Sequence, residues 1–380
     1  MGSVRKAPRS SRWEARWRST AGRSRTKSFD TKSDARAYLA TVETDLGRGT
    51  YVDPSGGRVR FDEWATRWWA TTNNLRPSTR ARDESYYRNH IEPAFARAPL
   101  ATIDHLAVRE WLAGLSAQGL APATVHKAYQ VLSKIMGAAV DAGLLAVSPC
   151  ERQPLPRVER QEMRFLDPGE AARLADVIDA RYRRLVLLGA YGGLRAGELF
   201  ALRRERVDVL HARVEVTETV VEVQGRHHFG PPKTRAGRRA VPLPRFVAEE
   251  LGAHLEGVAE GGLVFPAPQS GPVRASLFRR RFWTPAVEAA GLAPLRLHDL
   301  RHTAVAFWIA AGASSTEIAA RAGHTSVVTV LDRYGHLLPG AAERVDDALD
   351  VMARDANRDR NATARGAGVV QRLTKHRSRQ

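Results

Sequence analysis

The sequence predicts a mainly α-helical protein with small antiparallel β elements, and three observations lead to that class. Apolar residues recur at helical spacing through residues 60–150 and again through 277–352. Apolar and polar residues alternate, as they do in strands, near the N-terminus and over residues 207–223. The length of 380 residues favours two or three domains.

Residues 1–56 are expected to form a small β-α module. Trp13, Ala15 and Trp17 alternate with charged neighbours, residues 26–31 could form a second strand, and residues 31–46 have a helical pattern. The first 32 residues hold ten Lys or Arg and two acidic residues, a net charge of +8. We expect a basic sheet face that contacts DNA, and a solvated basic tail is the alternative. The candidate DNA-binding residues are Arg12, Arg16, Arg18, Arg23, Arg25 and Lys27.

Residues 60–150 are expected to form a compact helical domain. Phe61, Trp64 and Trp68 share one helix face, and Pro77 can begin a second helix. Asp104 can cap a third helix, and a fourth can begin at Pro122. The tryptophans are expected in the core rather than stacked on bases. Residues 151–162, rich in proline and charge, are expected to be a linker that could lie along a nucleic-acid backbone.

Residues 163–352 are expected to form the last domain, which begins with a capping box at Asp167 and Glu170. Strands over 207–223 and a further strand after a glycine-containing turn place Lys233 at or near a hairpin tip. Residues 353–380, with a net charge of +6, are expected to be a flexible basic tail.

The net charge of +18 and the isoelectric point near 10.8 favour a polyanionic partner, with nucleic acid as the leading candidate. A basic membrane-surface protein is the competing class, but the sequence has no apolar run of about 18 residues. The single cysteine, Cys150, cannot form an internal disulfide, which agrees with a reducing compartment. We therefore expect an intracellular protein.

Basic and nucleophilic residues recur within short segments of the C-terminal half. Arginine forks bind phosphate oxygens, lysine and histidine can move a proton, and a tyrosine hydroxyl can attack phosphorus. Together they indicate phosphoryl transfer without metal or cofactor. The segments are GGLRAGEL with Arg195, PPKTRAGRRAVPLP with Lys233, LHDLRHT with His298 and Arg301, AGHTS with His324, and DRYGHL with Tyr334.

These segments, with a tyrosine ten positions after the histidine of AGHTS, resemble the boxes of the tyrosine recombinase family, most closely phage-type site-specific integrases. The boxes cover Arg195 to Tyr334. The helical domain and the N-terminal module are similar in order and kind to the core-binding and arm-binding domains of such integrases. Two residues depart from the pattern of the family: Gly193 stands where threonine is frequent, and Ala322 stands where leucine is frequent. Neither departure changes a residue that carries the chemistry.

The resemblance implies the tyrosine recombinase catalytic fold and a role for each motif residue. Tyr334 would be the nucleophile, Lys233 the general acid, His298 the general base or phosphate-orienting group, and His324 a hydrogen-bond donor to the phosphate. Charge on the nonbridging oxygens would be stabilised by Arg195 and Arg301, which Glu198 and Asp299 are expected to orient. His302 is expected to be structural. The residues expected to hold DNA phosphates nearby are Arg235, Arg238 and Arg239.

The implied activity is site-specific DNA recombination or integration through a 3′-phosphotyrosyl intermediate and a Holliday junction. The implied partners are double-stranded DNA attachment sites, a homotetramer on DNA, a host DNA-bending protein and an excisionase. The implied location is the cytoplasm of a bacterial host cell, in association with the nucleoid. A catalytically inactive DNA-binding regulator with the same fold is the alternative. A type IB topoisomerase would share the chemistry but would not need the N-terminal module. A zinc site at His298 and His302 matches the HExxH zinc motif poorly. Asp299 stands where that motif has glutamate, and Arg301 would place a cation beside the bound zinc.

Overall fold

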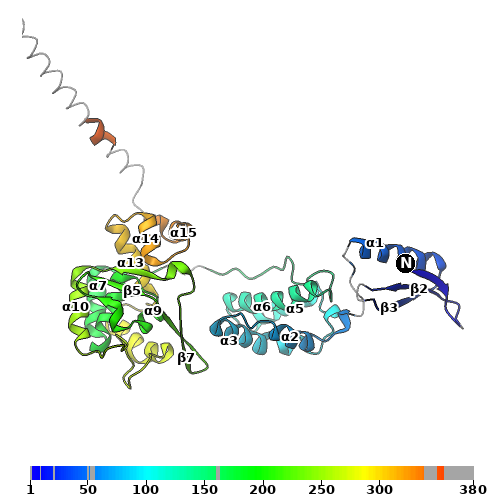
Figure 1. The fold of residues 1–380 in the computed structure, drawn as a ribbon, viewed down its shortest axis with the longest axis horizontal. Coiled ribbons are helices and arrows are strands. Elements are labelled where there is room, and N and C mark those ends of the chain that lie inside the picture. Colours follow the sequence, from blue (N-terminus) through cyan, green and yellow to red (C-terminus); the bar gives the residue numbers. More distant parts are fainter. Residues whose placement is uncertain are drawn as a thin grey trace, which may run out of the picture. The chain divides into compact units, whose positions relative to one another are not determined.

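The computed structural model describes residues 2–8, 10–19, 22–48, 51, 56–159, 163–337 and 349–354 (Figure 1). The chain divides into two compact units, Met1–Gln161 and Glu162–Gln380. The boundary falls at the end of the predicted linker. From residue 355 on, the predicted basic tail lies outside the described residues.

The first unit begins with a three-stranded antiparallel sheet in the order β1-β2-β3, followed by a helix. Ala15 and Trp17 of the middle strand are buried, and they pack with Ala35, Leu39 and Val42 of that helix. The predicted strands and helix are therefore present, and β1 is an additional strand. The bounds are β1 Ser3–Lys6, β2 Trp13–Arg18, β3 Ser24–Phe29 and α1 Lys32–Arg48.

A helical domain follows in the same unit. Phe61 and Trp64 are buried, and the Trp64 Nε1 donates a hydrogen bond to the Ile135 carbonyl at 2.9 Å, so this tryptophan belongs to the core as expected. The Asp104 carboxylate accepts from the Ala107 N–H at 2.8 Å and caps its helix as predicted. The bounds are η1 Gly56–Arg58, α2 Phe61–Ala70, α3 Pro77–Tyr86, η2 Tyr87–Ile91, α4 Glu92–Phe95, η3 Leu100–Thr102, α5 His105–Ala117 and α6 Pro122–Asp141.

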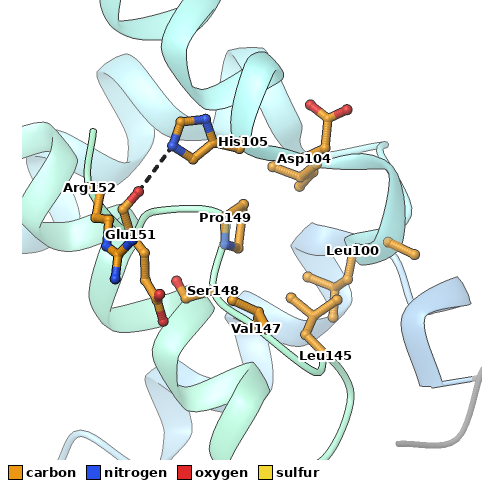
Figure 2. A pocket seen from close by; sticks show the side chains of 11 residues that line it. Leu100, Asp104, His105, Leu145, Val147, Ser148, Pro149, Glu151 and Arg152 are labelled. Atoms are coloured by element: carbon orange, nitrogen blue, oxygen red, sulfur yellow. Dashed lines mark hydrogen bonds between the residues drawn. The ribbon is translucent and has the colours of Figure 1, made fainter. Parts of the chain in front are cut away.

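The first part of the predicted linker is bound to this helical domain. His126 contacts the Pro156 carbonyl through Nε2 at 2.8 Å, and the Gln153 amide donates to the His105 carbonyl at 2.8 Å. Figure 2 shows His105 reaching the Glu151 carbonyl at the edge of a cavity of about 510 Å³. Buried Cys150 immediately precedes this stretch. The chain therefore leaves this domain several residues later than the predicted start of the linker.

The second unit packs α7, α10 and α13 against α8 and carries two small antiparallel sheets, β4-β5-β8 and β6-β7. The predicted capping box is present, with Asp167 and Glu170 each accepting from the other's backbone N–H. Helix α13 packs closely on α8 at Gly189, where an added Cβ would come within 2.8 Å of the Leu300 side chain. Figure 1 shows α13, α14 and α15 gathered at one side of the unit.

The bounds in this unit are α7 Pro168–Val177, η4 Ala180–Tyr182, α8 Arg183–Gly192, α9 Ala196–Ala201, η5 Arg204–Arg206, β4 Val207–Asp208, β5 Arg213–Val216, β6 Thr219–Val223, β7 Arg226–Gly230, η6 Arg235–Gly237, β8 Arg239–Pro242, α10 Arg245–Leu255, α11 Ala275–Phe278, η7 Arg279–Trp283, α12 Thr284–Ala289, α13 Asp299–Ala310, α14 Ser315–Ala322, α15 Val328–Tyr334 and η8 Gly335–Leu337. None of the described helices is long and apolar enough to cross a membrane.

The predicted hairpin around Lys233 is wrong. Strand β7 pairs with β6 across a tight turn at Gln224 and Gly225, whereas β8 pairs with β5. Lys233 therefore lies in the connection between two strands of different sheets.

Candidate active site

Arg301 is the most buried cation of the site, with 3% of the residue exposed. One turn of α13 carries His298, Arg301 and His302 at positions that share a face of the helix. The Arg301 Nη1 donates to the Gly193 carbonyl at 2.7 Å, and Nη2 donates to the Ala322 carbonyl. Burial, and next the charge of Arg195, lowers the pKa of Arg301 to about 9, so the guanidinium remains charged at neutral pH.

Arg195, at the start of α9, reaches the end of α14, where Arg301 also binds. Its Nη2 donates to the Gly323 carbonyl at 3.2 Å, next to the carbonyl of Ala322 that Arg301 binds. Its side chain is 38% exposed, so this guanidinium can also meet a ligand. Two arginines distant in sequence therefore converge on consecutive carbonyl groups at the end of α14.

The end of α14 also fixes the loop that carries Lys233. Gly323 adopts φ +61°, and a Cβ there would lie 2.8 Å from the Ala236 carbonyl oxygen. Lys233 is exposed three residues before Ala236, and Arg235 and Arg238 are exposed around it. The structure thus brings the lysine loop against the turn that holds both arginines.

The departure at Gly193 has a steric reason. Gly193 adopts φ +64°, and a Cβ there would come within 2.7 Å of the Trp308 ring. A side chain at this position would collide with Trp308, and the Gly193 carbonyl is a partner of Arg301.

Glu198 orients Arg195, as predicted, but it also binds a third arginine. Its carboxylate accepts from Arg195 Nη1 at 2.8 Å and from Arg239 Nη2 at 3.0 Å. Burial alone would raise the pKa of Glu198, yet the hydrogen bond and charge of Arg239, and then Arg195, lower it below the ordinary value. Glu198 therefore remains a carboxylate.

Two predicted contacts of the site differ from the structure. The Arg239 side chain is only 6% exposed and is held by Glu198 and by the Arg321 carbonyl at 2.7 Å, an environment that does not fit the predicted DNA phosphate contact. Asp299 was expected to orient Arg301, but it pairs with Arg296 at 2.9 Å. It also accepts from the Arg296 N–H at 2.7 Å, which directs the carboxylate toward the turn before α13.

His324 lies beside Arg301, whose Nη2 is 3.1 Å from His324 Nε2. Because a guanidinium can only donate, Nε2 is the acceptor and the proton of the neutral ring is on Nδ1. That Nδ1 is buried and has no hydrogen-bond partner within the described part of the chain. Burial, and next the charge of Arg301, lowers the pKa of His324 to about 4. The neutral ring therefore has a buried N–H donor that no described residue accepts.

Tyr334 lies at the end of α15 and is 1% exposed. Its Oη is 2.6 Å from His302 Nδ1. Burial raises the pKa of Tyr334 and lowers the pKa of His302 to about 4, so both groups are neutral at pH 7. His302, expected to be structural, therefore touches the predicted nucleophile. The only sequence signal for it was its place next to Arg301 and four residues after His298.

His298 is exposed at the start of α13, with its ring centroid 4.9 Å from that of His302. Desolvation by the surrounding protein, and next the charge of Arg301, lowers the pKa of His298. Among the described residues no cluster of three or more His, Cys, Asp or Glu side chains could hold a metal ion. Within the part of the chain that the structure describes, the pair His298 and His302 thus has no third ligand for a zinc site.

The N-terminal sheet carries a basic surface apart from the site described above. Because Ala15 and Trp17 face α1, the alternating residues Arg16 and Arg18 face away from it. Opposite residues of antiparallel strands share a face, so Arg16 stands beside Ser3 and Thr26, and Arg18 beside Ser24.

The other predicted DNA contacts of this module lie elsewhere. Arg25 and Lys27 are opposite Trp17 and Ala15 and therefore occupy the helix side, where the Lys27 Nζ is 4.3 Å from the centre of the Tyr38 ring. Arg12 pairs with Asp30 at 2.9 Å, and Arg23 is exposed in the turn before β3. The open face of the sheet thus carries Arg16 and Arg18 of the predicted set.

Comparison with known families places this geometry in context. Residues 164–340 match the phage integrase family, and residues 60–116 match the phage integrase N-terminal SAM-like domain. The chain is 30% identical over 360 residues to a putative prophage phiRv2 integrase of Mycobacterium tuberculosis, covering 91% of this chain and 94% of that protein. It is 27% identical over 342 residues to the integrase of Mycobacterium phage L5, covering 86% and 91%.

Solved structures show the same fold. The chain is similar to the Tn1549 transposon integrase in complex with transposon right end DNA, with a TM-score of 0.65, 16% identity, and 78% of this chain and 100% of that chain covered. It is also similar to a lambda integrase dimer bound to a COC′ core site, with a TM-score of 0.55, 17% identity, and 82% and 89% covered.

Proposed function

The chain belongs to the phage integrase family of tyrosine recombinases and is a site-specific DNA recombinase, and from this premise we propose that Tyr334 is the nucleophile of its strand exchange. The observation that carries the proposal is the convergence of Arg195 and Arg301 on the consecutive carbonyls of Ala322 and Gly323. The Tyr334 hydroxyl is 2.6 Å from the Nδ1 of His302, the residue next to Arg301.

The reaction exchanges one phosphodiester for another. The Tyr334 Oη forms a bond to phosphorus, the bond from phosphorus to the 5′-oxygen breaks, and Lys233 gives that oxygen its proton. The product is a 3′-phosphotyrosyl link with a free 5′-hydroxyl. The bond energy is retained for rejoining to a partner strand, so the step requires no external energy source.

Electrostatics favours a phosphate at this place. The described site gathers three guanidinium groups, of Arg195, Arg239 and Arg301, around the single carboxylate of Glu198. Burial, and then the charges of Arg195 and Arg239, lower the pKa of Arg301, and an entering phosphate would relieve the repulsion between these cations. Fixed cations in a desolvated site stabilise the charge that develops on the nonbridging oxygens.

The proposal extends to the assembly. A lambda integrase tetramer bound to a Holliday junction has the same fold at 17% identity and a TM-score of 0.55. We propose that this chain likewise acts as a homotetramer on two attachment sites, with its C-terminal tail in contact between protomers. A host DNA-bending protein and an excisionase would control direction. The open sheet face with Arg16 and Arg18 would bind a separate accessory DNA sequence, and nucleoid association would follow from the net charge of +18.

Covalent trapping tests the nucleophile. A nicked duplex carrying the attachment core site loses a short fragment after cleavage, so the protein–DNA adduct accumulates and survives a denaturing gel. Tyr334→Phe removes only the attacking oxygen, and we expect site binding to persist while adducts disappear. The matched control is Tyr191→Phe on α8, which should leave the adduct unchanged. Adducts formed by Tyr334→Phe would move the nucleophile to another residue.

A further inference from the structure

The Tyr334 hydroxyl has one hydrogen-bond partner within the described part of the chain, the Nδ1 of His302 at 2.6 Å. Both side chains are almost completely buried, with 1% of Tyr334 and 5% of His302 exposed. Their ring centroids are 5.8 Å apart. This is the geometry of a nucleophile and its base, because the atom that must lose a proton lies at hydrogen-bond distance from an atom that can accept it.

The other titratable side chains of the site make different contacts. The Nε2 of His324 accepts from Arg301, at 3.1 Å. His298 is exposed, and its ring meets His302 edge-on at 4.9 Å. Lys233 is exposed in the loop between β7 and β8. None of the three has a hydrogen bond to the Tyr334 hydroxyl within the described residues.

We propose that His302 is a catalytic residue that takes the proton of Tyr334 during attack on DNA. This inference rests on the proposed role of Tyr334 as nucleophile. As the bond from Oη to phosphorus forms, the hydroxyl proton passes to Nδ1 of the neutral imidazole, the bond from phosphorus to the 5′-oxygen breaks, and Lys233 gives that oxygen a proton. In rejoining, the 5′-hydroxyl attacks phosphorus and gives its proton to the neutral Lys233 amine, the bond from Oη to phosphorus breaks, and the imidazolium returns its proton to the Tyr334 oxygen. Protons and electron pairs balance over the cycle, and His298 remains free to contact the phosphate.

The charges around His302 fit an acceptor that is switched on by DNA. Burial is the main reason for its low pKa, and the neighbouring His298, Arg296 and Arg333 lower it further, whereas Asp299 acts in the opposite direction. Arg301 and Arg333 face Tyr334. The ring is therefore neutral and able to accept. A phosphate beside Arg301 adds negative charge, which favours the imidazolium and brings the base closer to the pH at which it must work.

The test measures single-turnover adduct formation by the full-length chain on a nicked core-site duplex. The pH is varied over roughly 5.5–9.5, the range in which a base poised near neutrality titrates. His302→Asn keeps an acceptor near Nδ1 but cannot hold the proton. We expect unchanged DNA affinity and about a hundredfold slower adduct formation near pH 7. The rate of this variant should keep rising with pH, because free tyrosinate replaces the missing base. In His298→Asn the rate should fall, but the pH at which it levels off should stay as in the unaltered chain.

A second measurement does not depend on how His302→Asn folds. Replacement of Tyr334 by a ring-fluorinated tyrosine makes the phenol more acidic. In the chain with His302 present, the rise of rate with pH should stay where it was, because it follows the imidazole. In His302→Asn, the fluorinated residue should restore much of the lost rate.

Two results would overturn the assignment of His302. One is a wild-type rate and pH profile for His302→Asn. The other is a profile that shifts to lower pH on fluorination while His302 is present, since tyrosine would then ionise on its own. If Tyr334 is not the nucleophile, Tyr334→Phe will still form the adduct. That outcome is therefore distinguishable from a failure of the His302 assignment alone.

Discussion

Glu198 and Arg239 form an ion pair at 3.0 Å with 2% and 6% of their side chains exposed. The same carboxylate holds Arg195 at 2.8 Å. Glu198 therefore links the start of α9, the strand β8 and, through Arg239, the end of α14. Its removal would leave two cations facing each other.

The first prediction is that Glu198→Ala destabilises the second unit by about 3–5 kcal/mol, because it leaves buried charge without a partner. Adduct formation should also fall as Arg195 loses its orientation. The control is Glu215→Ala, which removes an ion pair with Arg206 whose side chains are 43% and 45% exposed, and should change stability by less than about 1 kcal/mol. Urea unfolding measures both variants, and equal losses would contradict the structural role of Glu198.

The motif residues of the site were predictable because they lie in short segments with a fixed order, whereas their partners depend on packing between segments. Arg239 was predicted to hold a DNA phosphate together with Arg235 and Arg238, and those two side chains are exposed. Only the pairing of β8 with β5 turns Arg239 toward Glu198. Pairing between strands distant in sequence is not encoded in local alternation, and the hairpin expected around Lys233 failed for the same reason.

Local ambiguity accounts for two further differences. Asp299 has arginines at both 296 and 301 within reach, and the choice was decided by the backbone turn, whose Arg296 N–H binds the carboxylate. His302 has no distinguishing pattern beyond its helix, and its contact with Tyr334 arises where α13 meets α15. Most element types of the fold were predictable, but the strands β1 and β7 and the helix α10 were not predicted. The strands β1 and β7 each contain a single apolar side chain.

The second prediction concerns Gly323. Gly323→Ala should abolish adduct formation, because its Cβ would lie 2.8 Å from the Ala236 carbonyl and 3.1 Å from Arg239, which forces the lysine loop away from the arginines. Gly291→Ala is the matched control, since Gly291 has φ +70° and no atom within 4 Å of its Cβ position. Both variants should lose about 1 kcal/mol from backbone strain, and only Gly323→Ala should lose activity. Normal cleavage by Gly323→Ala would disprove the close packing.

The third prediction is a loss of stability in mild acid. The pKa of His302 is about 4 in the folded chain and near its ordinary value of 6.5 when unfolded. Above pH 6.5 both states are neutral. As pH falls toward 4, only the unfolded state gains the proton, so stability decreases by up to about 3 kcal/mol and then levels off. His302→Asn should flatten this decrease, and substitution of exposed His228 by Asn should not. An unchanged slope in His302→Asn would contradict the burial of a neutral imidazole.

The fourth prediction separates the two faces of the N-terminal sheet. The double substitution Arg16→Ala and Arg18→Ala should reduce the slope of log affinity against log salt by about 2, one for each lost phosphate contact. Lys27→Ala, on the helix side, should leave the slope unchanged. Removal of residues 1–56 should spare cleavage at the core site and abolish footprints on the accessory sequence. A larger effect from Lys27 than from the arginine pair would place the DNA on the other face.

The last prediction assigns the proton donor to Lys233, which lies exposed in the loop that Ala236 anchors against Gly323. Lys233→Ala should slow cleavage of ordinary DNA sharply with little change in affinity, as expected for an interaction made in the transition state. Sulfur in place of the bridging 5′-oxygen departs well as an anion and needs no acid. The variant should therefore cleave this substrate at close to the wild-type rate.

Arg195→Ala is the control for that experiment, because the nonbridging charge that Arg195 stabilises is present with either leaving group. It should stay impaired on the sulfur substrate. If sulfur rescues both variants, the substrate has only become more reactive and does not report on the acid. If it rescues neither, Lys233 positions DNA and the donor is another group, with His298 the next candidate, since its exposed ring at the start of α13 can reach a bound strand.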